Sequence, residues 1–243
     1  KQNVTHHLAT LKGFKRFNNF GKLTFQYDFQ RNNRLEYDIR RGDDKNKPSS
    51  DLKLDTHTVL FDMESDLTDE VSLKSGVMGR YQNNIANPNT GVRRLIPDYD
   101  KYDLGLYVIA DYQLNKRLLL ETGARFDYTY MDAFKFYRTS FWESRNYDQL
   151  FPEIVVEKLA NQIATNPQLN FNNGSATLGV NYIFDEDSKL FFNYSIASRA
   201  PNPSELFSEG LHHSASRIEL GDLSFNPEIA HKVALTFQKE NDL

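Results

Sequence analysis

Two neighbouring stretches of the sequence alternate between apolar side chains and polar or charged ones. In residues 104–114 and 118–130, almost every second residue is apolar or aromatic. A period of two predicts β-strands that each have one apolar face. The other face carries Glu121, Arg125 and Asp127, which a dry, two-sided core would not tolerate. These charges suit the water-filled lumen of a membrane β-barrel.

The same pattern recurs along the chain and predicts nine strands. Several of them span ten residues or more, which matches the roughly 9–11 residues that a tilted strand needs to cross a bilayer. Strands of soluble proteins are most often about 5–6 residues long. The predicted strands cover residues 6–17, which are less regular, and 22–30, 52–64, 71–83, 104–114, 117–130, 176–184, 189–198 and 231–238.

Short and long connections alternate between these strands. The short, polar ones lie at residues 18–21, 65–69, 115–116 and 185–188. The long ones lie at residues 31–50, 84–101, 137–170 and 199–228. Short turns at one end and long loops at the other are typical of outer-membrane barrels. Within the third long loop, residues 152–163 are expected to form a short helix.

Composition supports a barrel and excludes several other classes of protein. Aromatic residues make up 13% of the chain, yet the mean hydropathy is −0.63, a mixture that suits a barrel with a polar lumen. No run approaches the roughly 20 apolar residues of a membrane-spanning helix. The net charge of −4 argues against a nucleic-acid partner. The absence of cysteine excludes disulfides, thiolate metal sites and cysteine nucleophiles within the chain.

An open sheet of nine such strands would expose two long edges and an apolar face. We therefore predict an all-β fold in which residues 1–243 form part of a larger, closed transmembrane antiparallel β-barrel. The first residues, Lys1-Gln2-Asn3-Val4, lack the charged and apolar regions of a signal peptide. We expect the chain to be mature material or an internal piece of a longer protein.

Five short elements follow one another in the last long loop. They are Arg199-Ala200-Pro201, Glu205-Leu206, Gly210-Leu211-His212, Gly221-Asp222 and Pro227-Glu228. In this order they resemble the late-barrel signature of TonB-dependent outer-membrane receptors. Residues 30–38, with the sequence Gln-Arg-Asn-Asn-Arg-Leu-Glu-Tyr-Asp, are similar to a further element of many such receptors.

The resemblance implies a location in the bacterial outer membrane, in contact with outer-membrane lipid. It implies a barrel of about 22 strands closed around an N-terminal plug domain. No plug and no energy-coupling box is found in this chain, which would cover a middle-to-late portion of the barrel. The implied function is uptake of a scarce, bulky nutrient, commonly an iron complex, driven through the plug by the inner-membrane TonB energy-transducing complex.

The resemblance leaves the transported ligand open between an iron–siderophore complex and haem. Haem receptors of this family carry a Phe-Arg-Ala-Pro box and an Asn-Pro-x-Leu box with a ligand histidine between them. Here Arg199-Ala200-Pro201 precedes His212, but Ser198 replaces the phenylalanine and residues 222–225 replace the second box. Zinc-uptake relatives also carry a histidine in this loop.

Candidate ligand-binding residues gather in the same loop. Imidazole and carboxylate groups could bind iron, haem or zinc there, and neighbouring acids include Glu209, Glu219 and Asp222. The alternative is that the histidines serve only to pack the loop. The candidate ligand-binding residues are His212, His213, Arg199, Glu205 and Arg217. We assign no metal site and expect no resident cofactor.

Two other groups of residues allow a functional and a structural interpretation. The arginines at positions 31, 34, 40 and 41 and at 93 and 94 could attract an anionic siderophore or a lipopolysaccharide phosphate. They could equally form solvated loops paired with acids such as Glu36, Asp43 and Asp44. The aromatic residues between Phe134 and Trp142 could contact a planar ligand or form an aromatic girdle and loop core.

No residue set suggests catalysis, because the acidic pairs lie in turns and no phosphate-binding glycine loop is present. We therefore do not expect an enzyme. Two alternatives to active uptake stay open at this point. One is a passive porin or a β-barrel outer-membrane enzyme, and the other is a soluble all-β domain that binds a ligand such as carbohydrate.

Overall fold

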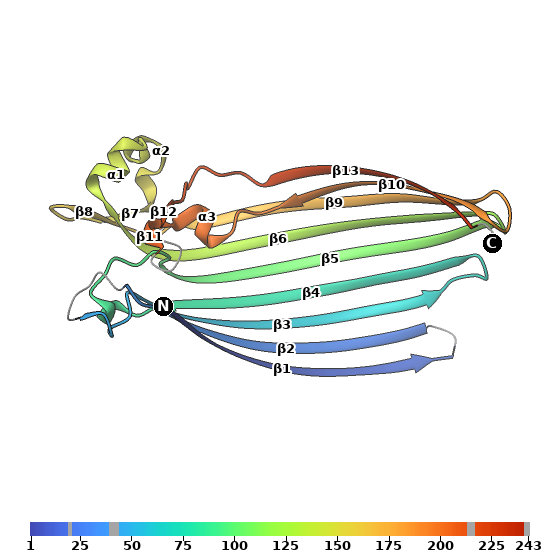
Figure 1. Ribbon diagram of the computed structural model, residues 1–243, viewed down its shortest axis with the longest axis horizontal. Coiled ribbons are helices and arrows are strands. Elements are labelled where there is room, and N and C mark those ends of the chain that lie inside the picture. Colours follow the sequence, from blue (N-terminus) through green and yellow to red (C-terminus); the bar gives the residue numbers. More distant parts are fainter. Residues whose placement is uncertain (19–20, 39–43, 213–216, 241–243) are drawn as a thin grey trace.

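A long, curved antiparallel sheet makes up most of the protein (Figure 1). The computed structural model describes residues 1–18, 21–38, 44–212 and 217–240. Within these residues, eleven strands form one sheet, and nine of them follow one another across it. In sheet order these nine are β1 (Gln2–Phe17), β2 (Gly21–Glu36), β3 (Ser50–Asp66), β4 (Val71–Ala86), β5 (Asp98–Asn115), β6 (Leu118–Arg138), β9 (Gln168–Ile183), β10 (Ser188–Arg199) and β13 (Glu228–Lys239).

The remaining elements belong to the long connections, all at one end of the sheet (Figure 1). The short strands β7 (Val155–Lys158) and β8 (Gln162–Thr165) extend the sheet beside the end of β6. A separate hairpin consists of β11 (Glu209–His212) and β12 (Arg217–Leu220). The helical elements are η2 (Pro88–Thr90), α1 (Thr139–Ser144), α2 (Tyr147–Leu150), η3 (Pro152–Ile154) and α3 (Pro203–Phe207). None of the described helices is long and apolar enough to cross a membrane.

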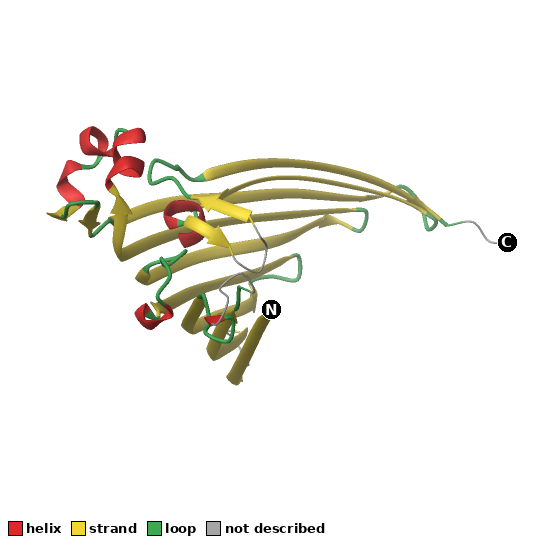
Figure 2. Ribbon diagram, turned by 60° about the vertical axis from the view of Figure 1, so that its left-hand side comes forward, coloured by secondary structure: helices red, strands yellow, loops and turns green. Residues whose placement is uncertain are grey.

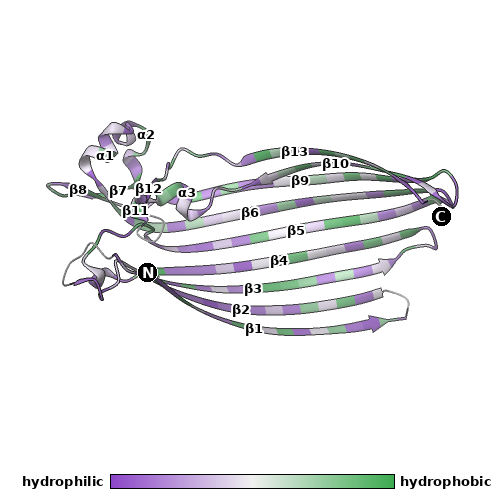
Figure 3. Cartoon of the chain, in the orientation of Figure 1, coloured by the Kyte–Doolittle hydropathy of each residue, from purple (hydrophilic) through white to green (hydrophobic). Residues whose placement is uncertain are grey.

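One face of the sheet is apolar and uncovered. Val77, Leu106 and Phe126 lie opposite one another on β4, β5 and β6, and Leu106 is 48% exposed. Green and purple bands alternate along the long strands in Figure 3, as expected for side chains that point to opposite faces in turn. Among the described residues no second layer packs on this apolar face. The predicted alternation is confirmed, and a two-layer sandwich with a dry core is excluded.

A row of aromatic rings crosses the apolar face near the end that carries the long loops. Ring centroids lie 5.0 Å apart for Phe29 and His57, 6.2 Å for His57 and Tyr81, 4.9 Å for Tyr81 and Tyr102, and 6.2 Å for Tyr102 and Tyr130. Ten residues separate Tyr102 from Tyr112 on the same face of β5, or roughly 33 Å along the strand. A strand tilted by about 40° would cover roughly 25 Å with that length, the height of the apolar band of outer-membrane barrels.

The opposite, inner face is polar, and several of its charged side chains are paired. The hydroxyl group of Tyr107 on β5 donates to Asp62 on β3, and its oxygen lies 2.5 Å from Oδ1. On β5, Lys101 Nζ lies 2.9 Å from Asp103, which also accepts a hydrogen bond from Thr129 on β6. The predicted charged face therefore exists as a continuous polar wall, as expected of a barrel lumen.

Two sequence-based expectations are wrong in detail at the end that carries the long loops. Strand β6 continues to Arg138 and β5 begins at Asp98, so both strands extend several residues beyond their predicted limits. Residues 152–163 form η3, β7 and the start of β8 instead of a helix. The backbone of β8 pairs with the extension of β6, with Ile163 opposite Tyr137, and this long-range pairing overrides the local helical preference.

Candidate functional site

Three long connections pack together at one end of the sheet, and we call their described residues the loop cap. It comprises residues 87–97, 139–167, 200–212 and 217–227 (Figure 2). The loops share one buried core with the C-terminal end of β6 and with the start of β5. Its buried residues are Tyr99, Met131, Ala133, Tyr137, Trp142, Tyr147, Ile163, Leu206, Phe207 and Leu223. The cap is thus a packed unit and not a set of separate solvated loops.

Helix α3 opens the last of these connections, and two predicted ligand-binding residues hold its start. Asn202 caps the helix and Glu205 completes a capping box with the Asn202 backbone N–H, a pairing that satisfies two helix-end donors. Arg199 Nη1 lies 2.9 Å from Glu205, and Arg199 Nη2 lies 2.6 Å from Glu228. The Arg199 hydrogen bond lowers the pKa of Glu205. Arg199 and Glu205 therefore form a clasp that ties α3 to the ends of β10 and β13.

Gly221 and Asp222 lock the second half of this connection onto α3. A Cβ atom at Gly221 would lie 2.6 Å from the backbone carbon of Leu206, so only glycine fits without displacement. Asp222 accepts hydrogen bonds from the Tyr147 hydroxyl at 2.8 Å and from Arg145 at 2.7 Å. Desolvation alone would raise the pKa of Asp222, but hydrogen bonds, first those from Ser224, lower it. Burial raises the pKa of Tyr147 to about 12, so its hydroxyl stays protonated and can donate.

His212 connects the hairpin to a distant strand. Its Nδ1 lies 2.8 Å from Glu219 on β12, and its Nε2 lies 3.1 Å from Glu36 and 2.8 Å from Arg34 Nη2 on β2. Five strands of the sheet separate β2 from β10, where this connection starts. The 30–38 element and the Gly-Leu-His element, recognised separately in the sequence, therefore contact each other.

The structure does not bring the remaining predicted residues into one metal-binding set. His213 lies outside the described residues. Arg217 pairs with Glu219 at 2.6 Å, and its side chain is 69% exposed. In the described part of the chain, no group of three or more His, Cys, Asp or Glu side chains is arranged to hold a metal ion.

Glu209 is the main feature of the cap that sequence reasoning missed. Its side chain is fully buried, and its carboxylate lies 2.6 Å from Arg93, 3.3 Å from Arg138 and 3.5 Å from Lys135. Burial lowers the pKa of Arg93 even though Glu209 opposes the shift. In the sequence, Glu209 was only one acid among several near the histidines. One signal in the sequence was available. Lys135 lies at an inward position of β6 between the aromatic residues Phe134 and Tyr137, and a lysine in such surroundings needs a buried acidic partner.

All four described arginines of the two arginine-rich loops are engaged in ion pairs, Arg93 with Glu209 as given above. Arg34 pairs with Glu36 at 2.6 Å, as the structural interpretation expected, Arg31 pairs with Asp55 at 2.8 Å, and Arg94 pairs with Asp98 at 2.8 Å. Positions 40, 41 and 43 lie outside the described residues.

The aromatic residues between positions 134 and 142 divide into two groups. Tyr137 and Trp142 are buried in the core of the cap, whereas Phe134 and Phe136 are exposed. The first pair therefore has a structural place, as does the partly buried Phe141, which stacks on Tyr137, whereas the second pair presents its rings at the surface.

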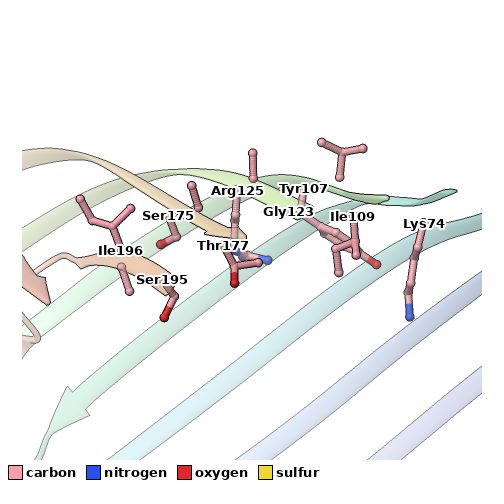
Figure 4. Close-up of a pocket in the computed structure, with 13 residues that line it drawn as sticks. Lys74, Tyr107, Ile109, Gly123, Arg125, Ser175, Thr177, Ser195 and Ile196 are labelled. Carbon is pink, nitrogen blue, oxygen red and sulfur yellow. The ribbon is translucent and has the colours of Figure 1, made fainter. Parts of the chain in front are cut away.

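The inner face of the sheet contains a cavity of about 440 Å³ (Figure 4). Small residues from neighbouring strands make room for it, since Gly123 lies opposite Thr177 on β9, which in turn lies opposite Ser195 on β10. Arg125 and Lys74 also line it. The cavity is a depression in the polar wall, and it lies apart from the candidate residues of the cap.

Comparisons with known proteins agree on the kind of barrel. A family model described as "TonB dependent receptor-like, beta-barrel" matches residues 2–238. No curated protein matches the chain in sequence. The structure is similar to the copper transporter OprC, with a TM-score of 0.71 and 13% identity over 98% of this chain. It is also similar to the siderophore receptor PiuA from Acinetobacter baumannii, with a TM-score of 0.65 and 10% identity over 97% of this chain.

A third similar structure is a double mutant of the Serratia marcescens hemophore receptor HasR in complex with its hemophore HasA and heme. Its TM-score is 0.64, with 14% identity over the whole of this chain. The match covers 37% of that receptor and 38% of the other two. The chain thus spans well under half the length of these receptors, and identities this low establish the fold alone.

Proposed function

The chain belongs to the TonB-dependent receptor β-barrel family, and from this premise we propose that it is part of an outer-membrane receptor for active uptake. The ligand would be a bulky, scarce nutrient, namely an iron–siderophore complex or haem. Uptake would leave the ligand chemically unchanged. The inner-membrane TonB complex would supply the energy through a plug domain that this chain does not contain.

One observation carries this proposal. The sheet has an uncovered apolar face bounded by an aromatic row, and its other face is a wall of paired charges. A sheet with these two faces is suited to stand between lipid and an aqueous lumen. The similar structures include receptors for a siderophore, for a hemophore with heme and for copper by their names, which supports the class of ligand but not a single member of it.

We place the ligand contact at the β11–β12 hairpin. Arg217, Ile218 and Leu220 are exposed on β12, so the hairpin offers a cation on one face and apolar side chains on the other. Arg199, Glu205 and His212 would act mainly by holding the hairpin and α3 in position, because their polar atoms already contact partners in the cap. A loop fixed in advance costs less ordering entropy when it binds a ligand.

The test is uptake by cells that lack their own iron and haem receptors and express the full-length receptor. We expect accumulation of radiolabelled iron from a siderophore or from haem, and we expect that deleting TonB abolishes it. Uptake that persists without TonB would indicate a passive pore and would refute the proposal.

Two variants locate the contact. Arg217→Ala is expected to reduce uptake at limiting ligand while leaving the cap folded, because Arg217 is exposed. His212→Ala together with His213→Ala is also expected to weaken uptake, through loss of the tie to β2. The control is His231→Ala, since His231 bonds Tyr194 on the outward face of the sheet, away from the cap.

A further inference from the structure

A cavity of about 210 Å³ lies where the 87–97 connection meets the C-terminal end of β6. Arg93 and Arg94 line it from the loop, Phe134 and Phe136 line it from β6, and Gln162 lines it from β8. No acidic residue is among the residues that line it. The cavity thus combines guanidinium groups with two phenyl rings.

The alternation along β6 shows which side the cavity faces. Phe134 and Phe136 share the face of Phe126 and Tyr128, and all four are exposed, while the intervening Lys135 and Tyr137 are buried beneath the cap. This is the apolar, outward face. Phe134 lies four residues beyond Tyr130 of the aromatic row, or roughly 13 Å along the strand. The cavity therefore lies just above the apolar band, where lipid headgroups begin.

Two of the arginines near the cavity, Arg94 and Arg138, have N–H groups that bond no other described residue. Arg93 is held by Glu209 through both terminal nitrogens and also donates to the Phe136 carbonyl oxygen at 3.0 Å. Arg94 donates a hydrogen bond to Asp98 through Nη1 alone. Arg138 does not line the cavity, but it lies opposite Gln162, which does. Arg138 bonds Glu209 through Nε alone, and its side chain is 59% exposed. Within the described residues, the other nitrogens of Arg94 and Arg138 have no hydrogen-bond partner.

The cations next to the cavity outnumber the carboxylates bonded to them. Arg93, Arg94, Lys135 and Arg138 contribute four positive charges, and Glu209 and Asp98 contribute two negative ones, so this bonded group carries a net charge of +2. Asp100 and Asp132 lie opposite each other on the same outward face, one step nearer the aromatic row, and their carboxylates accept hydrogen bonds from Tyr81 and Asn166. Planar guanidinium groups bind phosphate oxygens through paired hydrogen bonds, and basic clusters next to a bilayer attract anionic lipids.

We propose that the phosphate group of an outer-leaflet lipid binds in this cavity, on the outside of the barrel. Its oxygens accept hydrogen bonds from Arg94 and Arg138, and the apolar part of the lipid packs on Phe134 and Phe136. The inference rests on the membrane placement in the proposed function, but not on the identity of the transported ligand.

The test uses the purified full-length receptor in nanodiscs of phosphatidylcholine with a small fraction of lipid A. The lipid A that stays bound per receptor is measured by mass spectrometry. The double variant Arg94→Gln, Arg138→Gln is expected to retain about tenfold less, which is the effect of losing roughly one hydrogen bond to a charged group. The control is Lys53→Gln, because Lys53 is an exposed, paired cation at an outward position of β3 above the aromatic row.

Equal retention by the double variant and the unmodified receptor would overturn the proposal. Inorganic phosphate at millimolar concentration should leave the lipid in place. Displacement by phosphate would show a site for free anions and would overturn the lipid assignment. TonB-dependent uptake is measured on the same proteins, so loss of lipid A with normal uptake supports this inference, and failure of uptake with normal lipid binding counts against the proposed function alone.

Discussion

The sheet and the loop cap use charged residues in opposite ways. Where the sheet carries its apolar band, charges lie mainly on the inner face, and several of them pair with residues on the same or neighbouring strands, as Arg125 does with Asp127. In the cap, the carboxylate of Glu209 is fully buried and pairs with Arg93 across 116 positions of the chain. A lumen solvates its charges, whereas the cap must neutralise them within a core.

The difference has a consequence for stability. When a side chain on the inner face of the sheet is changed, water can take over its lost hydrogen bonds, so the loss of stability should be small. In the cap, no water or other group can replace the lost contact, so the loss should be larger. Each of the following variants therefore compares a position in the cap with a matched position that is exposed or lies in the sheet.

The largest effect is expected for Glu209→Gln. The change leaves Arg93, Lys135 and Arg138 without their carboxylate, and removing one partner of a buried ion pair costs about 3–5 kcal/mol. Amide hydrogen exchange in α1 and α3 should accelerate strongly while exchange in β3 stays unchanged. Glu228→Gln, at an exposed clasp residue, should cost less than about 1 kcal/mol. Unaltered exchange in the cap of Glu209→Gln would show that the cluster does not stabilise it.

Gly221→Ala is expected to come next. The added methyl group would meet the backbone of α3 at 2.6–2.7 Å, and overpacking of this kind costs about 1–3 kcal/mol. Gly79→Ala in β4 is the matched change, because no atom lies within 4 Å of the added Cβ position. Equal protease resistance of the two variants would contradict the close packing of Gly221 on α3.

Tyr147→Phe should have a moderate effect. Its hydroxyl group donates to Asp222 and accepts from the Leu223 backbone N–H at 3.0 Å. Its loss should cost about 1–3 kcal/mol because the buried Leu223 N–H is left without a partner, whereas Asp222 keeps its bonds from Arg145 and Ser224. Tyr128→Phe removes a hydroxyl that bonds Asn170 next to the aromatic row, where both partners are exposed and no buried group loses its partner. Similar shifts in the thermal unfolding of both variants would remove the distinction between the cap and the sheet.

The smallest expected effect is a dependence of the stability of the cap on pH. Because the pKa of Asp222 is lower in the folded cap than its unfolded value of about 3.9, the ionised carboxylate stabilises the cap above that value. This stabilisation is lost as the pH falls through the folded pKa. Hydrogen exchange in α2 should therefore rise on acidification below about pH 4, and Asp222→Asn should flatten that rise. An identical acid profile for Asp222→Asn would assign the effect to other groups.

The sheet could be predicted from the sequence because the alternation of apolar and polar side chains can be recognised within each strand. Alternation around Leu106 and Phe126 determines which side chains face outward, and the register then follows from strand to strand. The antiparallel order and the loop asymmetry were predicted for the same reason. The ends of the strands could not be predicted in this way. Beyond the apolar band, strand pairing depends on how the long loops fold, as where β8 pairs with the end of β6.

The cap could be predicted only as a set of motifs. The elements around Glu205, His212 and Asp222 were recognisable, but their contacts depend on the path of the loop. His212 lies 176 positions from Glu36, and no periodicity connects them. The burial of Glu209 was also beyond local reasoning, because a glutamate in a loop is ordinarily exposed. The motif residues with described side chains mainly build the cap, and their part in binding a ligand stays a prediction.

The orientation of the sheet is the central claim, and site-directed spin labelling tests it most directly. These 243 residues contain no cysteine, so single labels can be placed in the full-length receptor within a bilayer, one at Leu106 and one at Ile109, which is 40% exposed on the inner face of the same strand. We predict that a label at Leu106 is accessible to oxygen dissolved in lipid and not to a water-soluble nickel complex, with the reverse at Ile109. A label at Leu106 that is shielded from both reagents would place it in a dry protein interior and would contradict the account.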